Sequence, residues 1–336
     1  MKFTRSLAAL AIVFGASACT KTASPSEDAP MQDATPNVVT LLAYDSFTPV
    51  EGIFDAFTKA TGATVRVVTG GDTGTLVSKA IITAGNPEAD VLWGLDNTFL
   101  SRAQNADLLT SYEPVDYGDI CVNYDKTWFA NRGIAVPTSF EDLTLPAYKD
   151  LFVVQDAVAS SPGLGFLLGT IAHFGADKWQ DYWKALMQNG TRVSADWTSA
   201  YTIDFSGSSG KGKYPLVVSY GSSPPAEIVY SETPITEPST GVIESTCFRQ
   251  TEYVGTLRGA KNPKLSALLI SYLLDTSFQE SMPLSLFVFP INKAAVLPEV
   301  FKSFAVTPTN PLQIAPSDIE KNRDTWLDQW RDIAIG

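Results

Sequence analysis

Histidine is almost absent from this sequence, and cysteine, basic side chains and long apolar runs are scarce. His173 is the one histidine among 336 residues. Because zinc clusters are built from histidine and cysteine and most nucleophilic triads require histidine, the scarcity of both residues argues against both kinds of site. His173 ends an apolar helical run, which predicts a residue of the core or of a helix end. No nucleophile-elbow, kinase, metal or flavin motif is present, so we expect neither an enzyme nor a bound cofactor or metal.

Acidic residues outnumber basic ones, with 36 Asp and Glu against 24 Lys and Arg and a net charge of -12. Such a surface repels nucleic acid and anionic membranes and tolerates a cationic ligand, although solubility alone would also account for it. Hydrophobic residues make up 45% of the chain, enough for one or two packed domains.

The N-terminus has the pattern of an export signal. Lys2 and Arg5 precede an apolar run at 7–14, and small residues at 16–18 lead to Cys19. The apolar run is much shorter than the roughly 20 residues that a membrane-spanning helix needs, and no later run is long enough. We therefore expect residues 1–18 to be a signal peptide and the mature protein to lie outside the cytoplasm.

The segment around Cys19 also resembles a bacterial lipoprotein signal, which implies lipidation of Cys19. Such signals usually carry Leu where Ala16 stands, so ordinary cleavage to a soluble periplasmic or secreted protein is the alternative. Residues 19–37 are rich in Ser, Thr, Ala, Pro and acidic residues and cannot build a core, which favours a disordered tether.

Cysteine usage predicts one disulfide. With Cys19 as the anchor, Cys121 and Cys247 remain in a compartment that permits disulfides. We expect these two to pair, and two separate buried thiols are the alternative.

From residue 38 onward, short β-rich runs alternate with amphipathic helical stretches, which predicts an α/β architecture. Strands are expected at 38–44, 64–68 and 90–96, and helices at 162–174 and 177–188. The pattern suggests two α/β lobes joined by two extended crossing runs. The expected division is lobe 1 at 38–117 and 258–312, lobe 2 at 126–244, hinge strands at 118–125 and 245–257, and a C-terminal helix packed on the lobes within 313–336.

Two turns are candidate ligand sites. In the glycine-rich turn at 70–74, Asp72 either caps the following helix or faces a cationic ligand. The segment 160–165, which begins at Ser160, places hydroxyls, a proline and glycines at a helix start. It is a candidate anion cradle, and plain helix capping is the alternative.

Aromatic side chains at the predicted ends of elements are the second signal. The turn that holds Trp197 and Tyr201 is polar, which is an unusual place for an indole unless it stacks on something. A flat cationic heterocycle suits such rings, because a ring face contributes about 0.5–2 kcal/mol of cation–π attraction when water is excluded. Core packing is the alternative. The candidates are Tyr44, Trp197, Tyr201, Tyr220 and Phe287.

Eight short segments, spread in the same order over residues 38–330, resemble segments of the thiamine-binding proteins of ABC importers. These proteins are a branch of the type II periplasmic-binding-protein superfamily. The similar segments are Tyr44-Asp45-Ser46-Phe47, Ala89-Asp90-Val91, Gly94-Leu95-Asp96-Asn97, Asp116-Tyr117-Gly118, Tyr124-Asp125-Lys126, Ser161-Pro162-Gly163-Leu164-Gly165, Trp197 with Ser199-Ala200-Tyr201, and Ser219-Tyr220 with Ser223-Pro224.

The resemblance implies a set of ligand-binding side chains in a cleft between two lobes. Phe287 stands where the family usually has tryptophan, and the segment 225–227 lacks the family's stacking tyrosine, so Tyr201 or Phe287 would have to compensate. The side chains carried over to the cleft are Tyr44, Asp72, Ser160, Trp197 and Tyr220.

The resemblance further implies a function and its partners. The protein would capture thiamine, or its mono- or diphosphate, without chemistry. As a monomer held to the membrane only by its N-terminal lipid, it would deliver the ligand to a permease driven by an ATPase. Rival hypotheses are a binding protein of the same fold for a polyamine, a ferric ion or an organic phosphate or phosphonate, a secreted thiamine-modifying enzyme with a cysteine in the cleft, and a purely structural lipoprotein.

Overall fold

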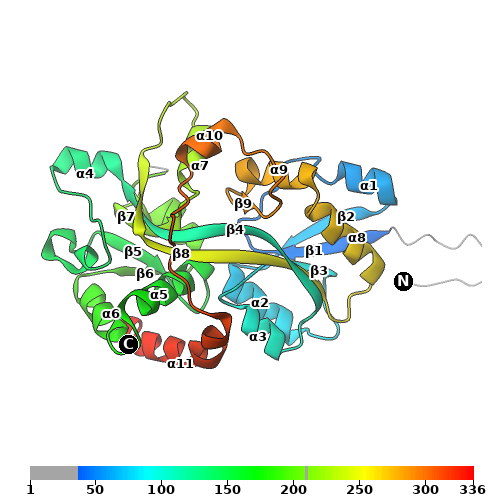
Figure 1. The fold of residues 1–336 in the computed structure, drawn as a ribbon, viewed down its shortest axis with the longest axis horizontal. Helices are drawn as coiled ribbons and strands as arrows, with labels where there is room; N and C mark the ends of the chain where they lie inside the picture. The colour runs from blue at the N-terminus through cyan, green and yellow to red at the C-terminus, as the bar shows by residue number, and fades with distance from the viewer. Residues whose placement is uncertain (1–36, 209–210) are drawn as a thin grey trace, which may run out of the picture. The chain divides into compact units, whose positions relative to one another are not determined.

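One mixed sheet organises the fold in the computed structural model, which describes residues 37–208 and 211–336. The sheet has nine strands, and helices cover both of its faces (Figure 1). The strands are β1 (Val38–Ala43), β2 (Thr64–Thr69), β3 (Val91–Asp96), β4 (Leu109–Asp125), β5 (Phe152–Gln155), β6 (Arg192–Ser194), β7 (Leu216–Tyr220), β8 (Thr240–Leu257) and β9 (Phe289–Pro290).

The strand order divides the sheet into two halves that share its two longest strands. The order is β2-β1-β3-β8-β4-β7-β5-β6, and β9 pairs with β4 off this path. Strands β1, β2 and β3 are parallel in the first half, and β5, β6 and β7 are parallel in the second. Between them β4 and β8 pair antiparallel along most of their length. The chain therefore enters the second half through β4 and returns through β8, in strands that extend beyond the predicted 118–125 and 245–257.

The two helices predicted at 162–174 and 177–188 are present to within two residues. Most of the helices connect successive strands, as in other α/β proteins. They are α1 (Asp55–Thr61), α2 (Thr73–Ile82), α3 (Leu100–Asn105), α4 (Lys126–Arg132), α5 (Ser161–Phe174), α6 (Trp179–Gln188), α7 (Pro224–Val229), α8 (Pro263–Leu273), α9 (Thr276–Ser285), α10 (Glu299–Phe304) and α11 (Pro316–Ala334), with 3-10 turns at Asp142–Thr144 and Pro146–Tyr148 and a π-helical turn, η3, at Ser199–Asp204.

The sequence patterns of individual elements explain their packing. Every residue of β3 is buried, as expected for a parallel strand covered on both faces. In α6 the buried residues Trp179, Tyr182, Trp183 and Leu186 recur every three or four positions and form one apolar stripe. The other side of α6 is polar, so this helix packs with a single face, against α5 and α11.

Helix α11 contacts both halves of the sheet. Its Trp330 packs edge-on against Trp183 of α6, with ring centroids 5.7 Å apart. About two turns earlier in the helix, the Arg323 guanidinium lies over the ring of Phe99, 4.7 Å from its centroid and next to α3. The C-terminal helix thus joins α6 of the second half to the α3 region of the first half.

The predicted disulfide lies between the two shared strands. Cys121 of β4 and Cys247 of β8 are bonded, with their Cα atoms 4.2 Å apart. Next to them, Arg249 donates to both carboxylate oxygens of its cross-strand partner Asp119, at 2.6 and 3.2 Å. A covalent bond and a bidentate ion pair therefore fasten β4 to β8 near the middle of the sheet.

Candidate ligand-binding pocket

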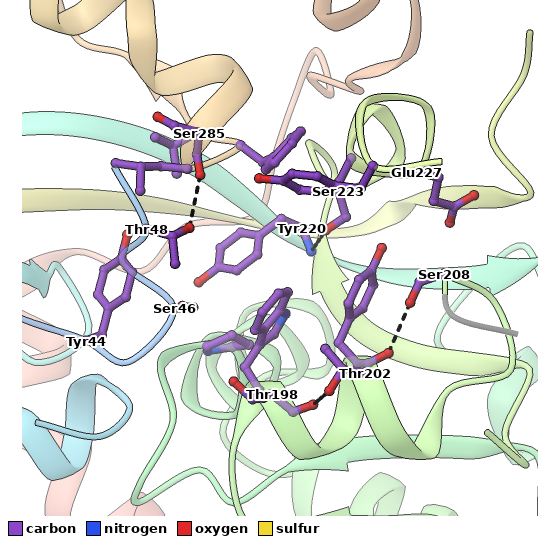
Figure 2. A pocket seen from close by; sticks show the side chains of 18 of the residues that line it. Tyr44, Ser46, Thr48, Thr198, Thr202, Ser208, Tyr220, Ser223, Glu227 and Ser285 are labelled. Atoms are coloured by element: carbon purple, nitrogen blue, oxygen red, sulfur yellow. Dashed lines mark hydrogen bonds between the residues drawn. The ribbon is translucent and has the colours of Figure 1, made fainter. Parts of the chain in front are cut away.

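A pocket of about 680 Å³ lies where the two halves of the sheet face each other. Its walls come from the loop after β1, the start of α2, the η3 region, the end of β7, α7 and the end of α9 (Figure 2). The lining residues are Tyr44, Asp45, Ser46, Thr48, Asp72, Thr73, Pro162, Trp197, Thr198, Tyr201, Thr202, Ser208, Tyr220, Ser223, Ala226, Glu227, Tyr230, Ser231, Ile235, Ser239, Glu252, Ser285, Leu286, Phe287 and Val288.

The structure brings most of the predicted site residues together on this wall. Tyr44, Asp72, Trp197, Tyr201, Tyr220 and Phe287 all line the pocket. Ser160 is fully buried behind it, beside Asp72. Its direct contact with a ligand stays a prediction.

Trp197 is fixed by three interactions. Its indole stacks on Tyr201 at 5.0 Å and 12°, and Tyr201 in turn stacks on Phe205. The indole Nε1 donates to Ser219 Oγ at 3.0 Å, and the backbone N donates to Asp72 Oδ2 at 3.1 Å. The ring is therefore pre-positioned at the pocket, with one of its faces backed by Tyr201.

Asp72 combines the two roles that the sequence left open. Its side chain caps α2 by accepting from Thr73 N at 2.8 Å, and it also lines the pocket. Through Trp197 N it links the first half of the sheet to the second. Burial raises the pKa of Asp72, and the nearby Ser160 hydroxyl and the hydrogen bonds from Thr73 N and Trp197 N partly oppose the rise.

Tyr44 and Tyr220 bring hydroxyl-bearing rings to the pocket from opposite halves, and Tyr220 reaches in between Tyr44 and the Thr198–Thr202 segment (Figure 2). Gly94 of β3 makes room for Tyr44, because a Cβ at Gly94 would lie 2.3 Å from the Tyr44 ring. The φ of Gly94 is +90°, a conformation that also favours glycine. Burial raises the pKa of both tyrosines well above the ordinary value, so both are neutral donors at physiological pH.

Phe287 meets a tyrosine that sequence reasoning missed. Tyr230 follows α7, lines the pocket and packs against Phe287 with ring centroids 5.6 Å apart. Phe287 has a φ of +54°, a strained backbone conformation that is often found at functional sites. Because Tyr230 lies in an irregular segment after the Ser223-Pro224 pair, no periodicity in the sequence marks it.

The charged side chains that line the pocket are all acidic. They are Asp45, Asp72, Glu227 and Glu252, and no Lys, Arg or His is among the described lining residues. Glu227 is engaged by Ser239 and Thr240 at the start of β8 and turns its carboxylate toward that strand (Figure 2). The field in the pocket therefore favours a cation.

Glu252 belongs to a row of three buried carboxyls that sequence analysis missed. Asp96 of β3, Glu252 of β8 and Asp116 of β4 are cross-strand partners, so their side chains lie on one face of the sheet. All three are at most 4% exposed. Burial raises the pKa of Asp96, and it raises the pKa of Asp116 and Glu252 well above the usual range, with repulsion from Asp116 and Asp96 adding to the effect on Glu252.

The segment predicted as an anion cradle is closely packed. Ser161 donates to Asp96, and a Cβ on Gly163 would lie 2.5 Å from the carbonyl oxygen of Gln155. Gly165 likewise accommodates the side chain of Ile120. These glycines permit contact with β5 and β4, and within this segment Pro162 is the residue that lines the pocket.

His173 lies at the end of a helix, as one of its two predicted placements requires. It is in the last turn of α5, and its Nε2 is 2.8 Å from Glu141 Oε1. Within 37–208 and 211–336, no group of three or more His, Cys, Asp or Glu side chains is arranged to hold a metal ion. The helices of that same part are each too short or too polar to cross a membrane.

A sheet shared by two halves, with a pocket between them, defines a binding protein of the two-lobed α/β class. The chain belongs to the bacterial extracellular solute-binding protein family, whose family model matches residues 44–280. Membership of an extracellular family supports the predicted location outside the cytoplasm. The predicted signal peptide, tether and Cys19 lie outside the described residues.

Within this family, the chain is similar to thiamine-binding periplasmic proteins. The thiamine-binding periplasmic protein of Salmonella typhimurium is 27% identical over 316 residues, which cover 88% of this chain and 92% of that protein. The thiamine-binding periplasmic protein of Brucella suis is 26% identical over 321 residues, covering 88% and 91%. The sequence resemblance to this group is confirmed.

Solved structures share the fold. A periplasmic thiamin binding protein superposes with a TM-score of 0.80 at 24% identity, covering 91% of this chain and 98% of that one. Iron-bound HitA from Pseudomonas aeruginosa gives a TM-score of 0.70 at 17% identity, covering 89% and 99%. These likenesses confirm the predicted two-lobed, type II periplasmic-binding-protein-like fold.

The row of buried carboxyls predicts how stability depends on pH. In the unfolded chain these groups titrate near pH 4, whereas the folded protein holds their protons to higher pH. The contribution of these groups to the free energy of unfolding is therefore complete below about pH 4, and it is lost as pH rises through the pKa of the folded state. We expect Asp116→Asn to be more stable than the unsubstituted protein at pH 8 by about 1 kcal/mol and to gain progressively less toward pH 5.

Denaturant unfolding of the ligand-free protein at several pH values measures this difference. Glu113→Gln is the matched control, because it removes an acidic side chain from an exposed position on the same strand. An Asp116→Asn variant that is equally destabilised at pH 5 and pH 8 would contradict the expectation.

Proposed function

We propose that the chain captures thiamine, or thiamine mono- or diphosphate, in this pocket and delivers it to the permease and ATPase of an ABC importer. The observation that carries the proposal is a pocket lined by aromatic rings and carboxyls, with no basic residue among its described lining. The thiamine-binding periplasmic proteins among the relatives support the choice of ligand. A flat, positively charged heterocycle complements both features of the wall.

The proposed binding mode assigns a role to each wall. Trp197, held by Tyr201 and Ser219, offers a ring face to the ligand. Phe287 after α9 and Tyr230 after α7 form a second aromatic wall, and Tyr230 follows the segment 225–227 of α7 that lacks the family's tyrosine. The hydroxyls of Tyr44 and Tyr220 and the carboxyls of the wall supply polar contacts, so the ligand is held without any bond being made or broken.

The two halves would act as lobes that close on the ligand. We assign lobe 1 to 38–117 and 258–312, lobe 2 to 126–244, and the hinge to 118–125 and 245–257 within β4 and β8, with 313–336 across both. Contacts from Asp72 to Trp197 and from Phe287 to Tyr230 bridge the halves on the pocket wall. A ligand that completes this wall stabilises the closed form by its preference for that form.

The state and position of the two cysteines support a binding role without catalysis. The rival enzyme hypothesis needs a nucleophilic cysteine in the cleft, whereas Cys121 and Cys247 are bonded to each other and absent from the described pocket wall. We propose a monomer with no enzymatic step.

Calorimetric titration tests the ligand. Purified protein is titrated with thiamine, its mono- and diphosphate, spermidine and ferric citrate. We expect saturable one-site binding of at least one thiamine form and no binding of spermidine or ferric citrate, because the pocket supplies stacking rings but few free carboxyls. Binding of spermidine or ferric citrate alone would refute the thiamine assignment, and binding of none would refute the proposed ligand class.

Trp197→Ala should weaken thiamine binding by roughly tenfold, the loss of about one stacking and cation–π contact. Trp128→Ala is the matched control, because Trp128 is a half-buried tryptophan of the second half that does not line the pocket. The dissociation constant is measured by calorimetry for both variants. Equal affinities for Trp197→Ala and the unsubstituted protein would remove Trp197 from the binding site.

We also propose that Cys19 is lipidated and that residues 19–37 tether the protein to the membrane. Cys19→Ser should then move the protein from the membrane fraction to the soluble extracytoplasmic fraction, because no second anchor is predicted. Fractionation followed by immunoblotting measures the shift. If the unsubstituted protein is already soluble after export, ordinary cleavage after Ala18 is the correct alternative.

A further inference from the structure

One carboxyl on the pocket wall has a buried oxygen without a donor. Asp72 accepts from Thr73 and Trp197, and Glu227 accepts from Ser239 and Thr240. Glu252 is 4% exposed and accepts at Oε1 from the Gln250 amide at 3.0 Å, whereas its Oε2 has no donor. A buried polar atom left without a donor is costly unless something else satisfies it.

Asp116 behind Glu252 is in a similar position. It is fully buried, and neither of its carboxyl oxygens has a donor, although it interacts side chain to side chain with Glu252. Asp96, the third carboxyl of the row, accepts from Thr98 N, Thr98 Oγ1 and Phe99 N at one oxygen and from Ser161 and Gln250 at the other. Asp96 is thus satisfied as an anion, and a proton in the row belongs to the Asp116–Glu252 pair.

The surroundings of the pair supply no compensating positive charge. The charged groups that act on Glu252 are Asp116 from β4 and Asp96 from β3, and the uncharged side chains of Trp93 and Tyr44 lie near it without a hydrogen bond to its Oε2. Tyr220 lies close by from β7. Arg323 of α11 acts on Asp96 but is engaged by Asp324, and Arg249 of β8 is paired with Asp119. Two adjacent buried carboxyls without a cation oppose each other's ionisation, which favours one proton shared between them.

We propose that Glu252, backed by Asp116, is the counter-charge for the cationic group of the ligand, and that the pair releases its shared proton to solvent when the cation binds. This inference rests on the proposed function, because it concerns the same pocket and a permanently charged ligand such as thiamine. The exchange keeps the charge of the buried row constant, since one positive charge leaves as another arrives. Glu252 thereby selects for charge, whereas the rings select for shape.

Proton release fixes the direction of the pH dependence. A ligand that binds with loss of a proton binds more tightly as pH rises, by at most about tenfold per pH unit for one proton. Below the pH at which the pair loses its proton, the cation has to displace it, and affinity falls. Burial raises the pKa of both carboxyls and repulsion from Asp96 adds to it, which moves this window above the usual range of carboxyl titration.

Calorimetry in two buffers measures the exchange directly. Thiamine is titrated at one pH in phosphate and in Tris, and the difference in heat gives the number of protons released. We expect about 0.5–1 proton for the unsubstituted protein and about zero for Glu252→Gln, which also binds thiamine roughly tenfold or more weakly. The neutral thiophene isostere of thiamine should release no proton and lose little affinity in Glu252→Gln. Protonation of the ligand itself cancels between the two proteins.

Two further variants make the result decisive. Asp116→Asn leaves Glu252 without its acidic neighbour, so it should reduce proton release and flatten the pH dependence of thiamine affinity, even if Glu252→Gln fails to fold. Glu113→Gln, on the exposed part of β4, should match the unsubstituted protein. Thiamine binding with equal proton release in the unsubstituted, Glu252→Gln and Asp116→Asn proteins would overturn the inference and leave the proposed function intact. Failure of the unsubstituted protein to bind thiamine would instead refute the function on which it rests.

Discussion

The antiparallel pairing of β4 with β8 is the interaction on which the rest of the structure depends. These strands are the one place where the polypeptide passes between the halves of the described sheet and returns. Backbone hydrogen bonds, the Cys121–Cys247 disulfide and the Arg249–Asp119 ion pair all hold the same pair together. Reorientation of the halves must therefore come from twisting or bending of these strands, with their register kept.

The same strand pair also places an unfavourable feature in the middle of the sheet. Its register sets Asp116 opposite Glu252, and β3 adds Asp96 to the row. Burying carboxyls in this way costs stability, because desolvation penalises their charged forms. Strained or destabilised groups of this kind cluster at functional sites, and here the row ends at the pocket wall. The rigid strand pair tolerates the cost, and the proposed role of Glu252 as a counter-charge would make use of it.

Residues at the ends of elements were predictable from the sequence, and residues defined by long-range pairing were not. Tyr44, Trp197 and Tyr220 follow or end recognisable elements, and the ends of strands meet at a common edge in α/β sheets. Glu252 lies inside an extended run that was assigned to the hinge. Its neighbours Asp96 and Asp116 are far away in sequence, and only the strand register brings them together. Gly163 signalled a close approach, but the sequence could not show that the approaching group is Gln155.

The placement of α11 has a mechanical consequence. Its two aromatic contacts attach it to different halves, through Trp330 on Trp183 and through Arg323 on Phe99. Any rotation about the central strands must therefore slide one of these contacts. A guanidinium over a ring can shift sideways more easily than an indole packed edge-on in the core. The helix would therefore move together with the second half and slide along the first. In the proposed closure the C-terminal helix would then limit how far the two halves can separate.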